Sequence, residues 1–165
     1  MLGTDEASLR EIDNLQRRYI EALDRRDLDA WLDCFSQDAA ASYYCISAEN
    51  VERGHEIALM FDDCHARLID RVTFITKIWT GTFQPYRTRH FAQRIGVPKK
   101  DKDGGQVCLV SNFSIAITPE GGSSNLLAVG QYEDRVVLDR GEPRFLRKRA
   151  VYDTTVLPRY IVYPF

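Results

Sequence analysis

The sequence predicts an α+β domain in which N-terminal helices pack on a curved, mostly antiparallel sheet. Through most of the first 79 residues apolar side chains recur every three or four positions, whereas after Pro85 they alternate. Helices that precede a run of strands are typical of α+β domains. A length of 165 residues, 44% of them hydrophobic, is sufficient for one continuous core. We therefore expect a single domain over residues 1–165, with helices at about 5–35 and 55–79 and the sheet at about 39–46 and 87–163.

Two helices are predicted at the N-terminus. The apolar face of the first is formed by Ile12, Leu15, Tyr19, Ile20 and Leu23. The second repeats the spacing over a shorter stretch, at Leu28, Trp31, Leu32 and Phe35. We expect Asp5 or Thr4 to cap the first helix and Asp27 to cap the second, because their side chains accept hydrogen bonds from free N–H groups.

The middle of the chain is less regular. Residues 39–46 are predicted to form a first strand, and residues 50–54 a turn. From His55 to Trp79 the apolar residues return to helical spacing, so we expect one helix, or a helix with a break, over about 55–79. Trp79 then belongs to the apolar face, and its removal is predicted to destabilise the fold.

Strands are predicted after Pro85. In the first of them the alternation places Phe91, Ile95 and Val97 toward the core. His90 would then lie on the outer face, unless a β-bulge near Thr88 reverses its orientation. The inward side of the next strand is formed by Val107, Leu109, Ser111, Phe113, Ile115 and Ile117. Residues 126–138 and 145–157 complete a meander, joined by a turn over residues 139–143.

Composition excludes several classes of function. Twenty-two basic residues against 24 acidic ones give a formal net charge of −2, and the basic residues are dispersed, so no nucleic-acid partner is expected. No window approaches the roughly 20 apolar residues of a membrane-spanning helix, and residues 1–9 do not resemble a signal peptide. We expect a cytoplasmic protein whose cysteines are reduced core residues, namely Cys34, Cys45, Cys64 and Cys108.

No metal site is expected in this chain. His55, His65 and His90 are far apart in the sequence, and no His-x-x-x-His or Cys-x-x-His spacing occurs. Cys64 and His65 are adjacent, but neighbours on a helix point about 100° apart and would not easily reach one ion.

A few polar residues offer the alternative of a catalytic pocket: Tyr19, Asp38, Tyr43 and His90. A carboxylate whose pKa is raised by an apolar pocket could transfer a proton beside a phenol, as a dehydratase or isomerase requires. Asp38 also has a structural interpretation, because an aspartate between a helix and a strand commonly accepts hydrogen bonds from local N–H groups.

Arginines gather in the predicted sheet or just before it, at positions 71, 87, 89, 94, 135, 147 and 149. In the triplet 147–149 the alternation places Arg147 and Arg149 on one face and Lys148 on the other. Because arginine is enriched in protein interfaces, an arginine-rich outer face indicates docking of another protein. The predicted subunit interface comprises Arg71, Arg87, Arg89, His90, Arg147 and Arg149.

The order of elements resembles the cone-shaped fold shared by nuclear transport factor two, ketosteroid isomerase and scytalone dehydratase. In that fold the alternative pocket would make the chain a stand-alone SnoaL-like dehydratase or isomerase, or a small-molecule-binding protein. Several segments between about Asp13 and the C-terminus also resemble the small β subunit of bacterial aromatic-ring-hydroxylating dioxygenases. They are Phe61-Asp62-Asp63-Cys64, residues 67–72, Trp79-Thr80-Gly81, Arg87-Thr88-Arg89-His90, residues 147–153 and Val156-Leu157.

The second resemblance implies a terminal oxygenase component in which this chain pairs with a large α subunit. That subunit would carry a Rieske 2Fe–2S cluster and a mononuclear iron and would hydroxylate an aromatic compound. The β subunit would be mainly structural and bind no cofactor, with three copies forming a trimer within an α/β hexamer. The residues of this chain agree with the implied absence of a cofactor. A Rieske centre needs two cysteines and two histidines in a spacing that this chain lacks. Residues 39–50 depart from the family in being poor in bulky strand formers.

Overall fold

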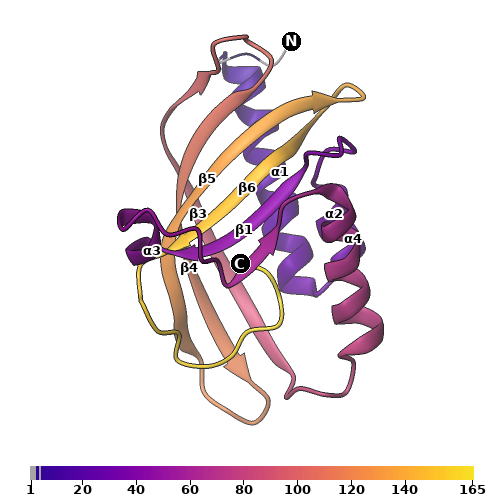
Figure 1. Ribbon diagram of the computed structural model, residues 1–165, viewed down its shortest axis with the longest axis vertical. Coiled ribbons are helices and arrows are strands. Elements are labelled where there is room, and N and C mark those ends of the chain that lie inside the picture. Colours follow the sequence, from indigo (N-terminus) through magenta and orange to yellow (C-terminus); the bar gives the residue numbers. More distant parts are fainter. Residues whose placement is uncertain (1–2, 4) are drawn as a thin grey trace.

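Helices dominate the first half of the chain, and the strands form a single six-stranded sheet (Figure 1). The computed structural model describes residues 3 and 5–165. The helices are α1 (Glu6–Arg25), α2 (Leu28–Asp33), α3 (Ala48–Glu52) and α4 (His65–Thr73), and the last continues into a π-helical turn, η1 (Phe74–Ile78). The strands are β1 (Ser42–Ser47), β2 (Met60–Asp62), β3 (Tyr86–Lys100), β4 (Val107–Pro119), β5 (Asn125–Asp139) and β6 (Glu142–Tyr152).

The sheet is mostly antiparallel, as predicted. Its strand order is β2-β1-β6-β5-β4-β3, in which β1 and β6 run parallel and the other neighbours run antiparallel. A two-residue turn joins β5 to β6, and its residues Arg140 and Gly141 have φ values of 52° and 87°. Positive φ at both positions gives the turn the twist that a tight hairpin needs.

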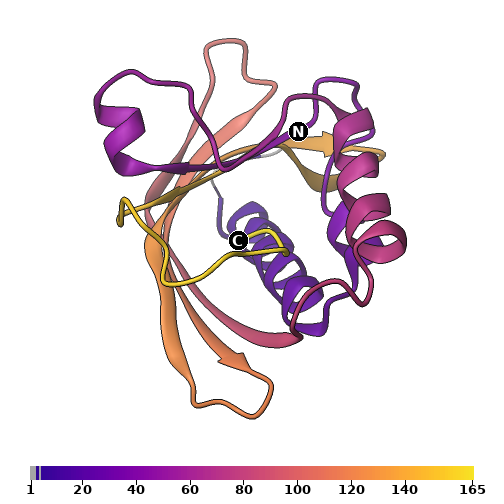
Figure 2. The same ribbon diagram turned by 60° about the horizontal axis from the view of Figure 1, so that its bottom comes forward.

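The sheet curls around α1 as a cone, with α2 and α4 on the open side (Figure 2). The predicted apolar face of α1 is confirmed, since Ile12, Leu15 and Leu23 are at most 1% exposed. Asp5 caps α1 by accepting a hydrogen bond from Ser8 N at 3.0 Å, and Asp27 caps α2 in the same way. Thr4, the other candidate cap, lies outside the described residues. None of the helices in the described part of the chain is long and apolar enough to cross a membrane.

The predictions for residues 50–52 and 55–64 were wrong. Residues 48–52 form helix α3, which the Ser47 side chain caps by accepting a hydrogen bond from Asn50 N. Of the turn predicted over residues 50–54, only residues 53–54 adopt it. Residues 60–62 form strand β2 instead of helix, since Met60 pairs with Cys45 of β1 and Leu59 N donates to the Cys45 carbonyl. Cross-strand bonding to β1, a tertiary contact, thus overrides the helical spacing of this segment.

The predicted orientation of β3 was also wrong. Phe91 and Val97 are 63% and 72% exposed, whereas Thr88 and His90 are buried. The inward side of β3 is partly polar because it packs against α1, which presents Asp13 and Asp24 to it. The inward set predicted for β4 is confirmed, with all six side chains buried.

The sheet ends at Tyr152 and does not continue to residue 163 as predicted. Residues 153–165 instead run as an irregular segment across the open end of the cone (Figure 2). The Tyr86 hydroxyl accepts hydrogen bonds from Val162 N and Tyr163 N at 2.8 and 3.0 Å. A tyrosine side chain therefore satisfies backbone groups that have no strand partner.

Candidate functional site

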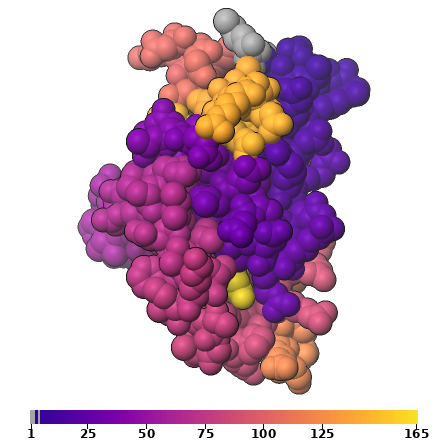
Figure 3. All heavy atoms as spheres, turned by 90° about the vertical axis from the view of Figure 1, so that its right-hand side faces the viewer, coloured from indigo at the N-terminus to yellow at the C-terminus, as the bar shows by residue number. Residues whose placement is uncertain are grey.

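The interior of the cone is filled by the protein's own side chains. Tyr19 and Tyr43 are fully buried, and both bind the same residue of the C-terminal segment. Tyr19 Oη donates to the Phe165 carbonyl, and Phe165 N donates to Tyr43 Oη at 2.8 Å. Burial raises the pKa of both phenols well above the usual value, so they remain neutral hydrogen-bonding groups. Seen from the helical side, only a small yellow area of the C-terminal segment remains visible (Figure 3).

A buried ion pair lies beside these tyrosines. Lys148 Nζ is 2.9 Å from Asp134 Oδ2 and donates to Gln16 Oε1 at 2.8 Å. The ammonium group lies 3.9 to 4.4 Å from three ring centroids, which belong to Tyr132, Phe145 and Tyr19. Burial lowers the pKa of Lys148, and the charge of Asp134 opposes that shift. The sequence correctly placed Lys148 on the opposite face from its two neighbours, but it gave no sign of the ion pair.

His90 points inward and is held by α1. Its Nδ1 lies 2.6 Å from Asp24 Oδ1, and its backbone N donates to Asp24 Oδ2 at 3.2 Å. The side chain of His90 is 1% exposed. Asp24, which sequence reasoning did not select, therefore fixes the last turn of α1 to strand β3, and a His90 substitution would act on the fold first.

The four residues of the alternative pocket do not meet at one point. Tyr19 and Tyr43 come together through Phe165, whereas His90 binds Asp24. Asp38 is exposed, and its Oδ1 accepts a hydrogen bond from Ala40 N at 2.8 Å. Asp38 thus has the backbone contact of its structural interpretation.

The described residues, 3 and 5–165, include no group of three or more histidine, cysteine or acidic side chains that could hold a metal ion. All four cysteines are free. Burial raises the pKa of Cys34 to about 11 and that of Cys45 to about 12. Both thiols are therefore protonated and pack as small apolar side chains.

Arg71 is engaged within the chain. Its guanidinium binds both carboxylate oxygens of Asp62, with one contact at 3.0 Å, and joins α4 to β2. Its side chain is only 14% exposed. With Arg71 and His90 bound internally, four of the six predicted interface residues remain at the surface: Arg87, Arg89, Arg147 and Arg149.

The outer face of the sheet carries these arginines. Arg149 Nη1 lies 2.9 Å from Glu133 Oε2 of β5. The Arg147 guanidinium carbon lies 5.5 Å from the Tyr44 ring centroid. Arg147 is half-buried, and this burial, together with Arg149 and Arg135, lowers the pKa of Arg147. Exposed apolar side chains share this face, among them Phe91 and Val97.

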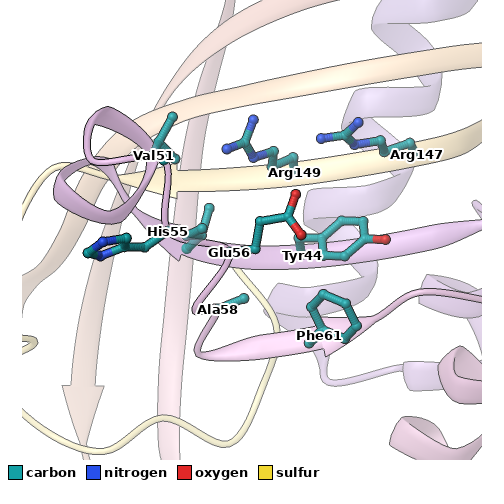
Figure 4. Close-up of a pocket in the computed structure, with 10 residues that line it drawn as sticks. Tyr44, Val51, His55, Glu56, Ala58, Phe61, Arg147 and Arg149 are labelled. Atoms are coloured by element: carbon teal, nitrogen blue, oxygen red, sulfur yellow. The ribbon is translucent and has the colours of Figure 1, made fainter.

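A pocket of about 330 Å³ lies at one side of these arginines, between β6, β1, β2 and the loop after α3 (Figure 4). Tyr44 and Phe61 form one wall and pack edge to face, with ring centroids 5.1 Å apart. Figure 4 shows Arg147 and Arg149 extending to the same side of β6. The pocket therefore joins aromatic surface to cationic groups.

Comparison with known proteins points to one family. The sequence profile described as ring hydroxylating beta subunit matches residues 18–159. The small subunit of anthranilate 1,2-dioxygenase from Burkholderia cepacia is 28% identical over 155 residues, which cover 93% of this chain and 92% of that protein. A beta subunit of the terminal oxygenase component of terephthalate 1,2-dioxygenase from Comamonas is 23% identical over 148 residues, covering 88% and 91%.

Solved structures agree with this result. A chain assigned as the beta subunit of an aromatic-ring-hydroxylating dioxygenase from Novosphingobium aromaticivorans superposes with a TM-score of 0.77 at 26% identity, covering 92% of this chain and 94% of that one. A chain from the same organism assigned as a scytalone dehydratase has a TM-score of 0.65 at 17% identity, covering 98% and 93%. The second likeness concerns the fold alone and confirms the predicted cone.

Proposed function

This chain belongs to the family of ring-hydroxylating dioxygenase β subunits, and from that membership we propose that it is the structural small subunit of a terminal oxygenase. It associates with a large α subunit that hydroxylates an aromatic compound. The large subunit holds the Rieske cluster and the mononuclear iron, and electrons reach it from a separate reductase. The small subunit contributes no catalytic group and binds no cofactor. Its free cysteines suit the reducing cytoplasm, where we place the complex.

The contrast between the two sides of the sheet carries this proposal. The inner side packs on Tyr19, Trp31 and Phe165, which are at most 1% exposed, so the protein's own side chains occupy the interior of the cone. The outer side exposes arginines and large apolar side chains, which is the composition of a protein interface. We propose that this side docks the large subunit and neighbouring copies of this chain, in a trimer within an α/β hexamer.

Co-expression with a candidate large subunit tests the proposal. We expect the two chains to elute together in size-exclusion chromatography, because obligate interfaces bury roughly 2,000 Å² or more. Light scattering on the same peak measures the stoichiometry. The control is this chain expressed alone, and two separately eluting chains in the co-expressed sample would count against the proposed function.

A further inference from the structure

Three arginines form a cluster on the outer face of β5 and β6, and we refer to Arg135, Arg147 and Arg149 as the arginine cluster. Arg135 and Arg147 are directly opposite each other in the strand register, and Arg149 lies two residues further along β6 on the same face. Glu133 pairs with Arg149. Within the described chain no carboxylate lies within 4.0 Å of the Arg135 or Arg147 guanidinium. The cluster therefore carries more positive charge than its neighbours neutralise.

This arrangement is unfavourable for the isolated chain. Like charges directly opposite each other on a sheet destabilise the pairing of the strands. Arg147 is also half-buried, which removes water from a charged group. A bound carboxylate would relieve both effects, and arginine suits that role because its planar group binds a carboxylate with two hydrogen bonds.

The surroundings of the cluster indicate an extended partner. Arg147 and Arg149 line two hollows, the Tyr44–Phe61 pocket on one side and a second one over β3, β4 and β5 on the other. The second hollow includes apolar side chains such as Ile95 and Val97. Apolar surface on both sides of the charge fits a polypeptide segment better than a small anion, which would occupy one hollow only.

We propose that the arginine cluster binds an aspartate or glutamate side chain of the large subunit, and that an apolar side chain beside it enters the Tyr44–Phe61 pocket. The inference rests on the proposed function and adds the chemistry of the docked segment. Glu56 also lines the pocket, but it lies beyond ion-pair distance of both Arg147 and Arg149. Its negative charge opposes an incoming carboxylate.

The test uses the wild-type complex and three single variants of this chain, Arg135→Gln, Arg147→Gln and Glu56→Gln. Affinity for the tagged large subunit is measured by biolayer interferometry over a series of salt concentrations. The matched control is Arg10→Gln, which removes an arginine of α1 that is 74% exposed and far from the cluster in sequence and fold. Melting temperatures of the free chains show whether each variant folds.

We expect Arg147→Gln to weaken binding about 30-fold or more, because it leaves a partner carboxylate unpaired. Arg135→Gln should weaken binding and reduce its salt dependence while raising the melting temperature of the free chain by about 1–3 °C, since a like-charge pair is removed. Glu56→Gln should strengthen binding or leave it unchanged. Arg10→Gln should bind as the wild type does.

Failure of the wild-type chain to bind the large subunit would contradict the proposed function itself. Wild-type binding with unchanged affinity in both arginine variants would overturn only the present inference. Weaker binding by Glu56→Gln would also overturn it, because Glu56 would then be a contact. Calorimetric titration of the chain with sodium benzoate tests a small ligand. If benzoate binds only when Arg147 is present, and the arginine variants still assemble with the large subunit, the cluster would be assigned to a small aromatic carboxylate instead.

Discussion

Replacing Asp134 with asparagine is expected to destabilise the free chain by about 3–5 kcal/mol, the usual effect of removing one partner from a buried ion pair. Asp134 and Lys148 are both fully buried, and Asp134 is the acid that pairs with the Lys148 ammonium group. The substitution preserves the shape of the side chain but removes its charge. Urea unfolding followed by circular dichroism measures the loss.

The direction in which the stability of Asp134→Asn changes with pH can also be predicted. Without Asp134, burial is the dominant effect on Lys148 and lowers its pKa in the folded state below the value in the unfolded chain. The unfolded state then binds more protons, so the stability of the variant should rise as the pH increases toward the ordinary lysine pKa. A deficit that stays constant with pH would contradict the assignment of the loss to an unpaired ammonium group.

A double variant, Lys148→Met with Asp134→Leu, is the control for packing. Replacing both members of a buried ion pair by apolar residues is often neutral or stabilising. We therefore expect the double variant to be more stable than Asp134→Asn. If it is less stable, the aromatic cage requires the cation itself.

Trp31→Ala is expected to destabilise the fold by about 3–5 kcal/mol, as truncation of a large aromatic core residue does. Trp31 is fully buried, and its ring centroid lies 4.9 Å from that of Phe35 and 5.7 Å from that of Tyr43. Thermal and urea unfolding measure the loss, and an unchanged melting temperature would contradict the burial of Trp31.

Trp79→Ala is the matched control, because the same substitution removes a tryptophan that is 39% exposed. We expect a loss of about 1 kcal/mol or less, as is usual for surface positions. The sequence predicted the opposite for Trp79, which lies just beyond the π-helical turn η1 and packs on Phe74, itself 44% exposed. Similar losses for the two tryptophan variants would contradict this distinction.

The regular helices and strands could be predicted from the sequence because their apolar residues follow a single spacing, either helical or alternating. The apolar face of α1, the caps Asp5 and Asp27, and the alternation of β4 follow from local spacing alone. Residues 55–64 could not be predicted in this way. Their apolar positions fit a helix, and the pairing of Met60 with Cys45 that makes Met60–Asp62 a strand is a contact between distant segments.

The candidate site could be predicted only where local alternation alone decides which way a side chain points. Alternation along β6 separated Arg147 and Arg149 from Lys148, and the structure confirms that separation. Along β3 the rule that apolar residues face inward failed for His90, because Asp24 of α1 supplies a hydrogen-bond partner for the inward-facing ring. A contact between a helix and an edge strand leaves no local pattern in either segment.

Iron content is the measurement that tests the central claim most directly. This chain, the large subunit and their complex would be purified separately, and iron and oxidation of an aromatic compound in the presence of the reductase measured for each. We expect iron in the large subunit and in the complex, activity in the complex, and neither in this chain alone. Stoichiometric iron bound by this chain alone, or turnover of an aromatic compound by it, would contradict the account.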